Sequence, residues 1–355
     1  MSDNPWHPWQ QRLADAPAAA RPHFEALLHG AGRLGAAGVR ALAQALELPL
    51  HRLMMHLLPF AQRLAVPAIS DFYVGAVASG EPGPDGWPAL YFGANVEFRG
   101  QALGFVVHAE QSAVNHAWLC GEPRLHALAV SAAPCGYCRQ FLFELAGGAD
   151  LPILLPEKNL EGLVARTLGS YLPHAFGPAD LGKTARLMAP SQPPLRLELA
   201  SGDPDDPLVR AALQAAALSH APYSGGHAGC ALQTQRGRIH AGRYAENAAY
   251  NPSLPALASA IANQRVSQPP DEHDPITRAV LVEVASSAGQ RSASRAMLDS
   301  WAPGVELVYC PAHRSTDPGH RGRSARSAVA SAMAAAPCCG IIAPPPSPTP
   351  PEPPP

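Results

Sequence analysis

Apolar residues in the first 65 positions recur at steps of three and four, a spacing that places them on one face of a helix. Glycines between Gly30 and Gly38 interrupt the first half of this pattern and weaken it. We expect residues 1–65 to form an N-terminal helical region that covers the domain after it. The pattern is carried by Leu27, Leu28, Leu34, Val39, Leu42 and Leu46.

After this region the pattern changes to runs typical of strands. The run Phe72–Ala78 ends at a turn-rich stretch, Gly80–Pro88, and Ala89–Phe98 is expected to return as its hairpin partner. Because side chains alternate along a strand, Asn95 and Glu97 should share one face of the second strand. Two polar groups on one face indicate either a binding site or a solvated strand edge.

A helix–strand–helix–strand order is predicted between residues 108 and 155. One helix begins at His108, and a second follows Pro134 and carries Cys138. Leu125–Ala132 and Leu151–Leu155 are short apolar runs typical of buried strands. The imidazole and the thiols would thus lie at helix starts, whose positive partial charge favours thiolate over thiol. The apolar stripe of the first helix consists of Ala109, Ala113, Val114, Ala117 and Trp118.

The candidate chemistry lies in His108-Ala109-Glu110 and Pro134-Cys135-Gly136-Tyr137-Cys138. One imidazole and two thiols supply three ligands of a tetrahedral zinc ion and leave one position open for water. Zinc lowers the pKa of such a water to about 7. Glu110, close to the metal but not bound to it, would carry the proton. H-x-E with P-C-x-x-C is the signature of zinc-dependent nucleobase deaminases.

Two alternatives to a catalytic zinc site are less consistent with these residues. A structural zinc site is normally closed by four protein ligands, and no fourth thiol or imidazole stands nearby at ligand spacing. We interpret His116 and Cys120, further along the predicted helix, as packing residues. A redox C-x-x-C would leave His108 and Glu110 without a role.

Composition narrows the choice of partners. The chain has 355 residues, 15% of them charged, and a net charge of −2, which does not favour binding to nucleic acid or to a membrane. Its 7 cysteines suggest no disulfide framework, so a reducing, cytoplasmic location is expected. We find no basic-then-apolar leader and no run of about 18 apolar residues.

The second half repeats motifs of the first. Gly242–Asn247 resembles Gly93–Glu97, which indicates a diverged internal duplication. In place of His108-Ala109-Glu110 the second copy is expected to carry Asn251-Pro252-Ser253, and no P-C-x-x-C follows. Asn is a poor zinc ligand and Ser carries no proton at neutral pH, so this copy should be metal-free.

These patterns predict five segments. Residues 1–65 are the helical region, 66–184 the zinc-binding catalytic domain and 209–310 the metal-free domain, joined by a proline-rich linker, 185–208. Residues 311–355, rich in Arg, Ser, Ala and Pro, are expected to form a disordered tail. Its Cys338-Cys339 pair has no partner at metal spacing.

The stretches His108-Ala109-Glu110-Gln111-Ser112-Ala113 and Pro134-Cys135-Gly136-Tyr137-Cys138-Arg139-Gln140 resemble the cytidine deaminase family, and most closely its long, two-domain homodimeric branch. The resemblance extends from about Leu50 to about Val308. It implies an α/β fold of the cytidine-deaminase-like three-layer α-β-α type, in tandem duplicated domains with an N-terminal helical region.

The resemblance also implies an activity, the zinc-dependent hydrolytic deamination of cytidine and 2′-deoxycytidine in pyrimidine salvage. One Zn²⁺ per subunit would be held by His108, Cys135 and Cys138, with Glu110 as the proton carrier. A homodimer with a composite active site is implied, because Phe176, in the loop Leu172–Pro178, would come from the partner subunit. The implied substrate-binding residues are Asn95 and Glu97 at the ribose, with Phe72, Ala109 and Phe176.

Two rival functions stay open at this point. A deaminase acting on cytosine in single-stranded nucleic acid would need a basic groove along the strand, and a carboxylate such as Glu97 beside the sugar would disfavour a nearby phosphate. A zinc-stabilised structural protein would have no need of Glu110.

Overall fold

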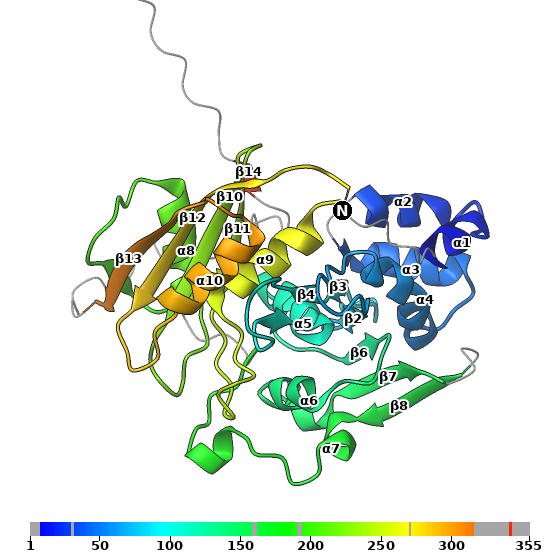
Figure 1. The fold of residues 1–355 in the computed structure, drawn as a ribbon. Coiled ribbons are helices and arrows are strands. Elements are labelled where there is room, and N and C mark those ends of the chain that lie inside the picture. Colours follow the sequence, from blue (N-terminus) through cyan, green and yellow to red (C-terminus); the bar gives the residue numbers. More distant parts are fainter. Residues whose placement is uncertain are drawn as a thin grey trace, which may run out of the picture.

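A computed structural model describes residues 8–29, 32–157, 162–189, 194–269, 271–315 and 341–342. Within these residues the chain forms two six-stranded sheets and a separate two-stranded ribbon (Figure 1). Each large sheet lies between helices, so the expected α/β, three-layer α-β-α architecture in tandem copies is confirmed. No helix within the described ranges is both long enough and apolar enough to cross a membrane.

The described part of the N-terminal region is largely helical, as the spacing of its apolar residues predicts, and contains four helices. They are α1 (Pro8–Ala14), α2 (Arg21–His29), α3 (Ala36–Ala45) and α4 (Leu50–Gln62). Between α2 and α3 the chain also forms a short strand, β1 (Arg33–Leu34), which the pattern did not indicate and which pairs with the edge of the first sheet. Phe24 and Phe60 stack at a centroid distance of 4.8 Å in the core of this helical layer.

The first sheet has the strand order β1-β3-β2-β6-β7-β8. Neighbouring strands are antiparallel except β6 and β7, which are parallel and joined by a helix. One face packs against α1–α4, and the opposite face packs against α5 (Ala109–Leu119) and α6 (Gly136–Phe143). The strands are β2 (Gly75–Ser79), β3 (Leu90–Ala94), β6 (Ala127–Val130), β7 (Pro152–Pro156) and β8 (Leu163–Thr167).

The second sheet repeats this plan, with the order β14-β11-β10-β12-β13-β9. Neighbouring strands are again antiparallel except for one pair, β12 and β13, which are parallel and joined by a helix. Helix α8 (Pro207–Ala217) covers one face, and α9 (Ala256–Ser267) and α10 (Arg291–Trp301) cover the other. The strands are β9 (Leu197–Leu199), β10 (Ala228–Thr234), β11 (Arg238–Arg243), β12 (Ile276–Val284), β13 (Leu307–Arg314) and β14 (Ile341–Ile342).

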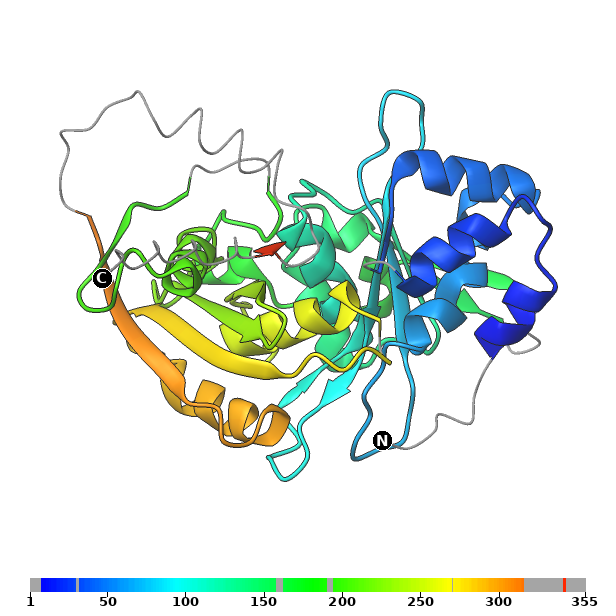
Figure 2. The ribbon, with the colours of Figure 1, turned by 90° about the horizontal axis from the view of Figure 1, so that it is seen from above.

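Helices α5 and α9 meet between the two sheets (Figures 1 and 2). Their side chains belong to one continuous core that draws on both halves of the chain, with Val114 and Ala117 on one side and Leu257 and Ile261 on the other. The two halves therefore share their largest hydrophobic cluster.

A close approach of strand to helix recurs in both halves and fixes how they correspond. A Cβ on Gly93 would lie 2.1 Å from the backbone nitrogen of Ala113, and a Cβ on Gly242 would lie 2.1 Å from that of Ala260. Only glycine allows such an approach. Ala113 therefore corresponds to Ala260.

This correspondence corrects one prediction. The position of His108 is taken in the second half by Pro255, and that of Glu110 by Leu257, instead of by Asn251 and Ser253. The predicted correspondence was four residues early, because the segments that join strand to helix differ in length, with 14 residues (95–108) in the first half and 12 residues (244–255) in the second. Neither Pro255 nor Leu257 can bind a metal or carry a proton.

Observed strands extend into the segments that we expected to be linker and tail. Strand β9 lies inside the expected linker and pairs with β13, and β13 continues to Arg314, beyond the expected end of the second domain at 310. Strand β14, within the expected tail, pairs with β11. The rest of the tail after Ser315, including Cys338 and Cys339, lies outside the described residues.

Candidate active site

The two motifs lie at helix starts, as their spacing predicts. His108 is the residue immediately before α5, and Cys135 is the residue immediately before α6, and both have extended backbone conformations. The backbone N–H of His108 donates to Gln111 Oε1 at 3.2 Å, which satisfies one of the groups left open at a helix start. The parallel strands that precede and follow α6 hold its start against α5.

His108, Cys135 and Cys138 come together with the dimensions of a metal site. Their ligand atoms all lie within 4.8 Å of one another. Cys135 Sγ is 3.7 Å from His108 Nδ1 and 3.7 Å from Cys138 Sγ. Tetrahedral zinc with ordinary bond lengths requires about 3.6 Å between a nitrogen and a sulfur ligand and about 3.8 Å between two sulfurs. The donor set therefore fits zinc and leaves room for a fourth ligand.

The protonation states of the two thiols favour the binding of a metal cation. Contact with Cys138 and with His108 lowers the pKa of Cys135 to about 3, so Cys135 is a thiolate at neutral pH. The same contact with Cys135, together with burial, raises the pKa of Cys138. Without a metal the two sulfurs therefore share one proton, which a bound zinc ion would displace.

Glu110 lies in the first turn of α5 and is 4% exposed. Burial raises the pKa of its carboxyl above the ordinary value, against the opposing effect of neighbouring hydrogen bonds and of His108. A carboxyl with a raised pKa gains and loses a proton more readily near neutral pH. The carboxyl is thus suited to carrying a proton beside the metal site.

Two residues that the motif analysis did not single out support His108. The Tyr137 ring stacks on the His108 imidazole, with centroids 5.0 Å apart and planes 22° apart. Gln111, besides accepting from His108, donates through Nε2 to the backbone oxygen of Pro252 in the second half at 3.1 Å. Both residues lie inside the recognised motifs, so the sequence could have indicated them. It could not indicate which groups they contact.

Asn95 breaks the predicted second strand of the hairpin. The run Ala89–Phe98 forms β3, ends at Asn95 and continues as β4 (Val96–Glu97), which pairs with β5 (Val106–Val107) in the separate ribbon. Asn95 Oδ1 accepts from the N–H of Val74, and its Nδ2 donates to the oxygen of Phe72, each at 2.9 Å. These bonds hold residues 72–74 in a loop, so strand β2 begins only at Gly75 and not at Phe72.

Glu97 lies across the ribbon from Val106, two residues before His108. Its carboxylate accepts from the N–H groups of Ile69 and Ser70 at 2.7 and 2.8 Å, and from the Ser70 hydroxyl at 2.5 Å. Burial lowers the pKa of His108, but contact with Cys135 and the nearby negative charges, of which Glu97 contributes the least, raise it above its ordinary value. Glu97 and Asn95 therefore face one loop, residues 69–74, beside the metal ligands.

The remaining predicted residues differ in their exposure. Ala109 is buried at the start of α5, whereas the side chains of Phe72 and Phe176 are 60% and 45% exposed. Phe176 lies in a loop before η2 (Pro178–Leu181), and its backbone oxygen accepts from Gln140 Nε2 of α6 at 2.6 Å. Both aromatic residues are thus only partly covered by the rest of the described chain.

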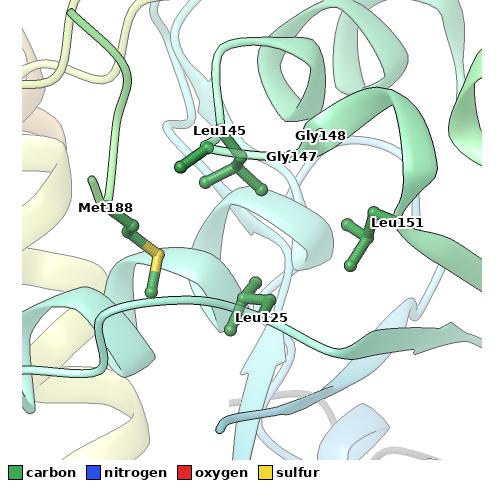
Figure 3. Close-up of a pocket in the computed structure, with 7 residues that line it drawn as sticks. Leu125, Leu145, Gly147, Gly148, Leu151 and Met188 are labelled. Atoms are coloured by element: carbon green, nitrogen blue, oxygen red, sulfur yellow. The ribbon is translucent and has the colours of Figure 1, made fainter. Parts of the chain in front are cut away.

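A small cavity lies apart from these groups (Figure 3). Its volume is about 10 Å³, close to the least that one water molecule requires. No polar side chain of the described residues lines it, so it is a packing gap and not a substrate pocket. Its walls are Leu125, Leu145, Ala146, Gly147, Gly148, Leu151 and Met188.

Comparison with known proteins agrees with this geometry. The family model described as "Cytidine and deoxycytidylate deaminase zinc-binding region" matches residues 49–150, and a second model of the same description matches residues 168–295. The first match contains the metal-site cluster, and the second covers much of the copy that lacks it. The chain is therefore a hydrolytic deaminase of a zinc-binding class.

Three cytidine deaminases are similar over most of their length. That of Sodalis glossinidius is 48% identical over 77% of this chain and 89% of its own, that of Serratia proteamaculans 45% over 78% and 87%, and that of Yersinia pestis 50% over 64% and 71%. A crystal structure of cytidine deaminase from Burkholderia pseudomallei matches 36% of this chain and 98% of its own, with 29% identity and a TM-score of 0.30. The chain belongs to the cytidine deaminase family.

Proposed function

We propose that this enzyme converts cytidine and 2′-deoxycytidine to the corresponding uridines and ammonia. The observation that carries the proposal is the cluster of His108, Cys135 and Cys138 with the buried Glu110 beside it. Relatives called cytidine deaminase, at 45–48% identity over most of the chain, support the same substrate class. The setting we propose is pyrimidine salvage in the cytoplasm.

We assign the zinc ligands to His108 Nδ1, Cys135 Sγ and Cys138 Sγ, with one zinc ion per chain. The bound metal supplies an activated water to the reaction. The chain's own contribution is a fixed set of donors at two helix starts, with Tyr137 and Gln111 restraining His108.

Glu110 moves the protons. It accepts a proton from the attacking water and passes one to N3 of the cytosine ring, which makes C4 more electrophilic. It then relays the second proton of that water to the exocyclic amino group, which leaves as ammonia. One carboxyl whose pKa is raised by burial serves all of these transfers.

Asn95 and Glu97 are the proposed ribose-binding groups, with Phe72, Ala109 and Phe176 around the base and sugar. The Glu97 carboxylate already accepts from Ser70, so a ribose hydroxyl would take the place of, or share with, that donor. Adjustment of the 69–74 loop on binding would accommodate this exchange. A negative charge at this position would also disfavour a 5′-phosphate.

The exposed rings of Phe72 and Phe176 support a homodimer with a composite site. Exposed aromatic rings beside a polar site are typical of surfaces that another molecule covers. In the proposed dimer Phe176 contributes to the active site of the partner subunit. Sedimentation of the purified enzyme, and mixing of Glu110→Gln with Phe176→Ala chains to restore activity, would test this arrangement.

The decisive experiment follows the ultraviolet absorbance of cytidine after adding purified enzyme, with and without a zinc chelator. Parallel reactions contain 2′-deoxycytidine, free cytosine, cytidine 5′-monophosphate and a single-stranded oligodeoxynucleotide. We expect efficient, chelator-sensitive loss of both nucleosides and poor reaction of the other three. Deamination of the oligonucleotide without that of cytidine would instead support the nucleic-acid alternative.

A further inference from the structure

The buried carboxylate of Glu144 joins the two halves at the end of α6, the helix whose start carries two of the proposed metal ligands. Glu144 terminates α6, the helix that begins with the two cysteines, and is 1% exposed. A negative charge at a helix C-terminus opposes the helix dipole, and burial of a carboxylate is unfavourable unless donors surround it. Neither local helix preference nor solvation therefore accounts for an acidic residue here.

Among the described residues, the side-chain and backbone donors to this carboxylate all come from the metal-free half. His220 Nε2 and the Tyr223 hydroxyl donate to Glu144 Oε1 at 3.0 and 2.7 Å, and the N–H of Ala248 donates to Oε2 at 3.0 Å. Burial and the adjacent carboxylate raise the pKa of Tyr223, so its phenol keeps its proton and remains a donor. One turn earlier on α6, Asn247 Nδ2 donates to the oxygen of Gln140 at 2.9 Å.

The donors lie on a loop whose counterpart in the first half faces the proposed substrate site. Glu246 accepts from the N–H groups of Tyr223 and Ser224 and from the Ser224 hydroxyl, just as Glu97 accepts from Ile69 and Ser70. The backbone of His220 pairs with residues 244–246 as that of Val66 pairs with residues 95–97. The backbone arrangement is thus retained in both copies.

The side chains of the two corresponding loops, residues 66–70 and 220–224, differ between the half with the metal ligands and the half without them. Apolar Val66 and Ile69 of the first copy correspond to His220 and Tyr223 of the second, and these two are the side-chain donors to Glu144. The copy without the metal ligands therefore carries two donors that contact the helix of the other copy's thiols.

We propose that the metal-free half positions the zinc ligands of the catalytic half, and that Glu144 is the positioning residue through which it acts. The loop 220–224 holds the end of α6, which keeps Cys135 and Cys138 at the separation that zinc requires. This inference rests on the proposed assignment of the two cysteines as ligands. It predicts that weakening the Glu144 contacts loosens the metal without removing any ligand.

The test measures how fast the zinc-loaded enzyme loses its metal to a coloured chelator. The variants are Glu144→Gln, Tyr223→Phe and the double variant. An amide in place of Glu144 must direct its NH₂ toward a donor, and Phe removes one donor with little change in shape. We expect zinc release about tenfold faster in Glu144→Gln, the scale at which residues behind metal ligands act. A smaller increase is expected in Tyr223→Phe.

Because the two residues act through one contact, the double variant should release zinc no faster than Glu144→Gln alone. With cobalt(II) in place of zinc, the thiolate-to-metal and d–d bands should shift in the same variants. The control is Glu283→Gln, which alters another buried carboxylate, 4% exposed, that accepts from the second half's own Gln290. It should lower the melting temperature but leave zinc release and the cobalt spectrum unchanged.

Unchanged zinc release in Glu144→Gln and Tyr223→Phe, or an equal acceleration in Glu283→Gln, would overturn the positioning role and leave the ligand assignment intact. A Cys138→Ala chain that kept full zinc would overturn the ligand assignment, and the positioning role with it.

Discussion

Ser70 donates its hydroxyl hydrogen to the Glu97 carboxylate at 2.5 Å, beside the metal ligands. Together with the bond that the N–H of Phe72 donates to the same hydroxyl oxygen, this contact orders the loop that carries Phe72. If Glu97 binds the ribose as proposed, substrate hydroxyls compete with this internal donor, and the strength of that competition can be measured.

Glu97→Gln should raise the KM for cytidine by roughly 10- to 100-fold, because a hydrogen bond to a charged acceptor contributes about 1.5–3 kcal/mol. Zinc content should not change, since Glu97 lies outside the ligand cluster. Ser70→Ala is the matched control: it keeps the carboxylate, and its KM should change less. Steady-state kinetics on both variants provide the measurement, and an unchanged KM in Glu97→Gln would remove Glu97 from the ribose site.

Glu110→Gln should keep its zinc and its fold but lose activity by at least roughly 10²–10⁴-fold, because the amide cannot carry a proton. The measurements are turnover of cytidine and zinc content on the same sample. Glu122→Gln, which changes a carboxylate bonded to the Tyr91 hydroxyl, should retain normal turnover. Near-normal turnover in Glu110→Gln would contradict the proton-transfer role.

Cys138→Ala should lose zinc and thermal stability together, because metal binding contributes to folding where ligands from separate elements meet. Cys230→Ala, at another fully buried free cysteine, removes a similar volume from strand β10. It should lower the melting temperature but keep the zinc. Metal analysis and thermal unfolding with and without added zinc distinguish these outcomes.

Acid should destabilise the fold partly through His240, which is fully buried and has no hydrogen-bond partner at either ring nitrogen among the residues that the structure describes. Burial lowers the pKa of His240 to about 4. Between that value and the pKa of about 6.5 of an unfolded histidine, the unfolded chain binds the extra proton. The free energy of unfolding therefore falls as the pH drops through this window, by up to about 3 kcal/mol from this residue.

In His240→Leu the free energy of unfolding should depend less on pH. Urea unfolding at several pH values between 7 and about 4 measures this dependence. The exposed residue His51 offers the control, since His51→Leu should leave the slope as in the natural chain. A variant at His240 with an unaltered slope would show that other groups dominate the acid response.

Local patterns predicted the catalytic half well because its chemistry is local. His108 and Glu110 share one helical turn, and Cys135 and Cys138 share another, so the motif and the predicted helix starts already define most of the cluster. The break of the strand at Asn95 was missed, because its cause is a side chain that bonds the backbone of Phe72 and Val74 in a different segment.

Contacts between distant segments could not be predicted from local sequence patterns. Glu144 is separated from Tyr223 and Ala248 by most of a domain, and no periodicity in either stretch indicates that they meet. Likewise, the register of the second copy at Pro255 depends on the close approach of Gly242 to α9, which becomes apparent only in three dimensions.

The core shared by α5 and α9 has a consequence for how the molecule unfolds. Because Val114 and Ala117 are buried in the same cluster as Leu257 and Ile261, neither half can open without exposing the apolar face of the other. The duplicated architecture should consequently melt in a single cooperative transition. Since zinc binds only one copy, its removal should lower the midpoint for both at once.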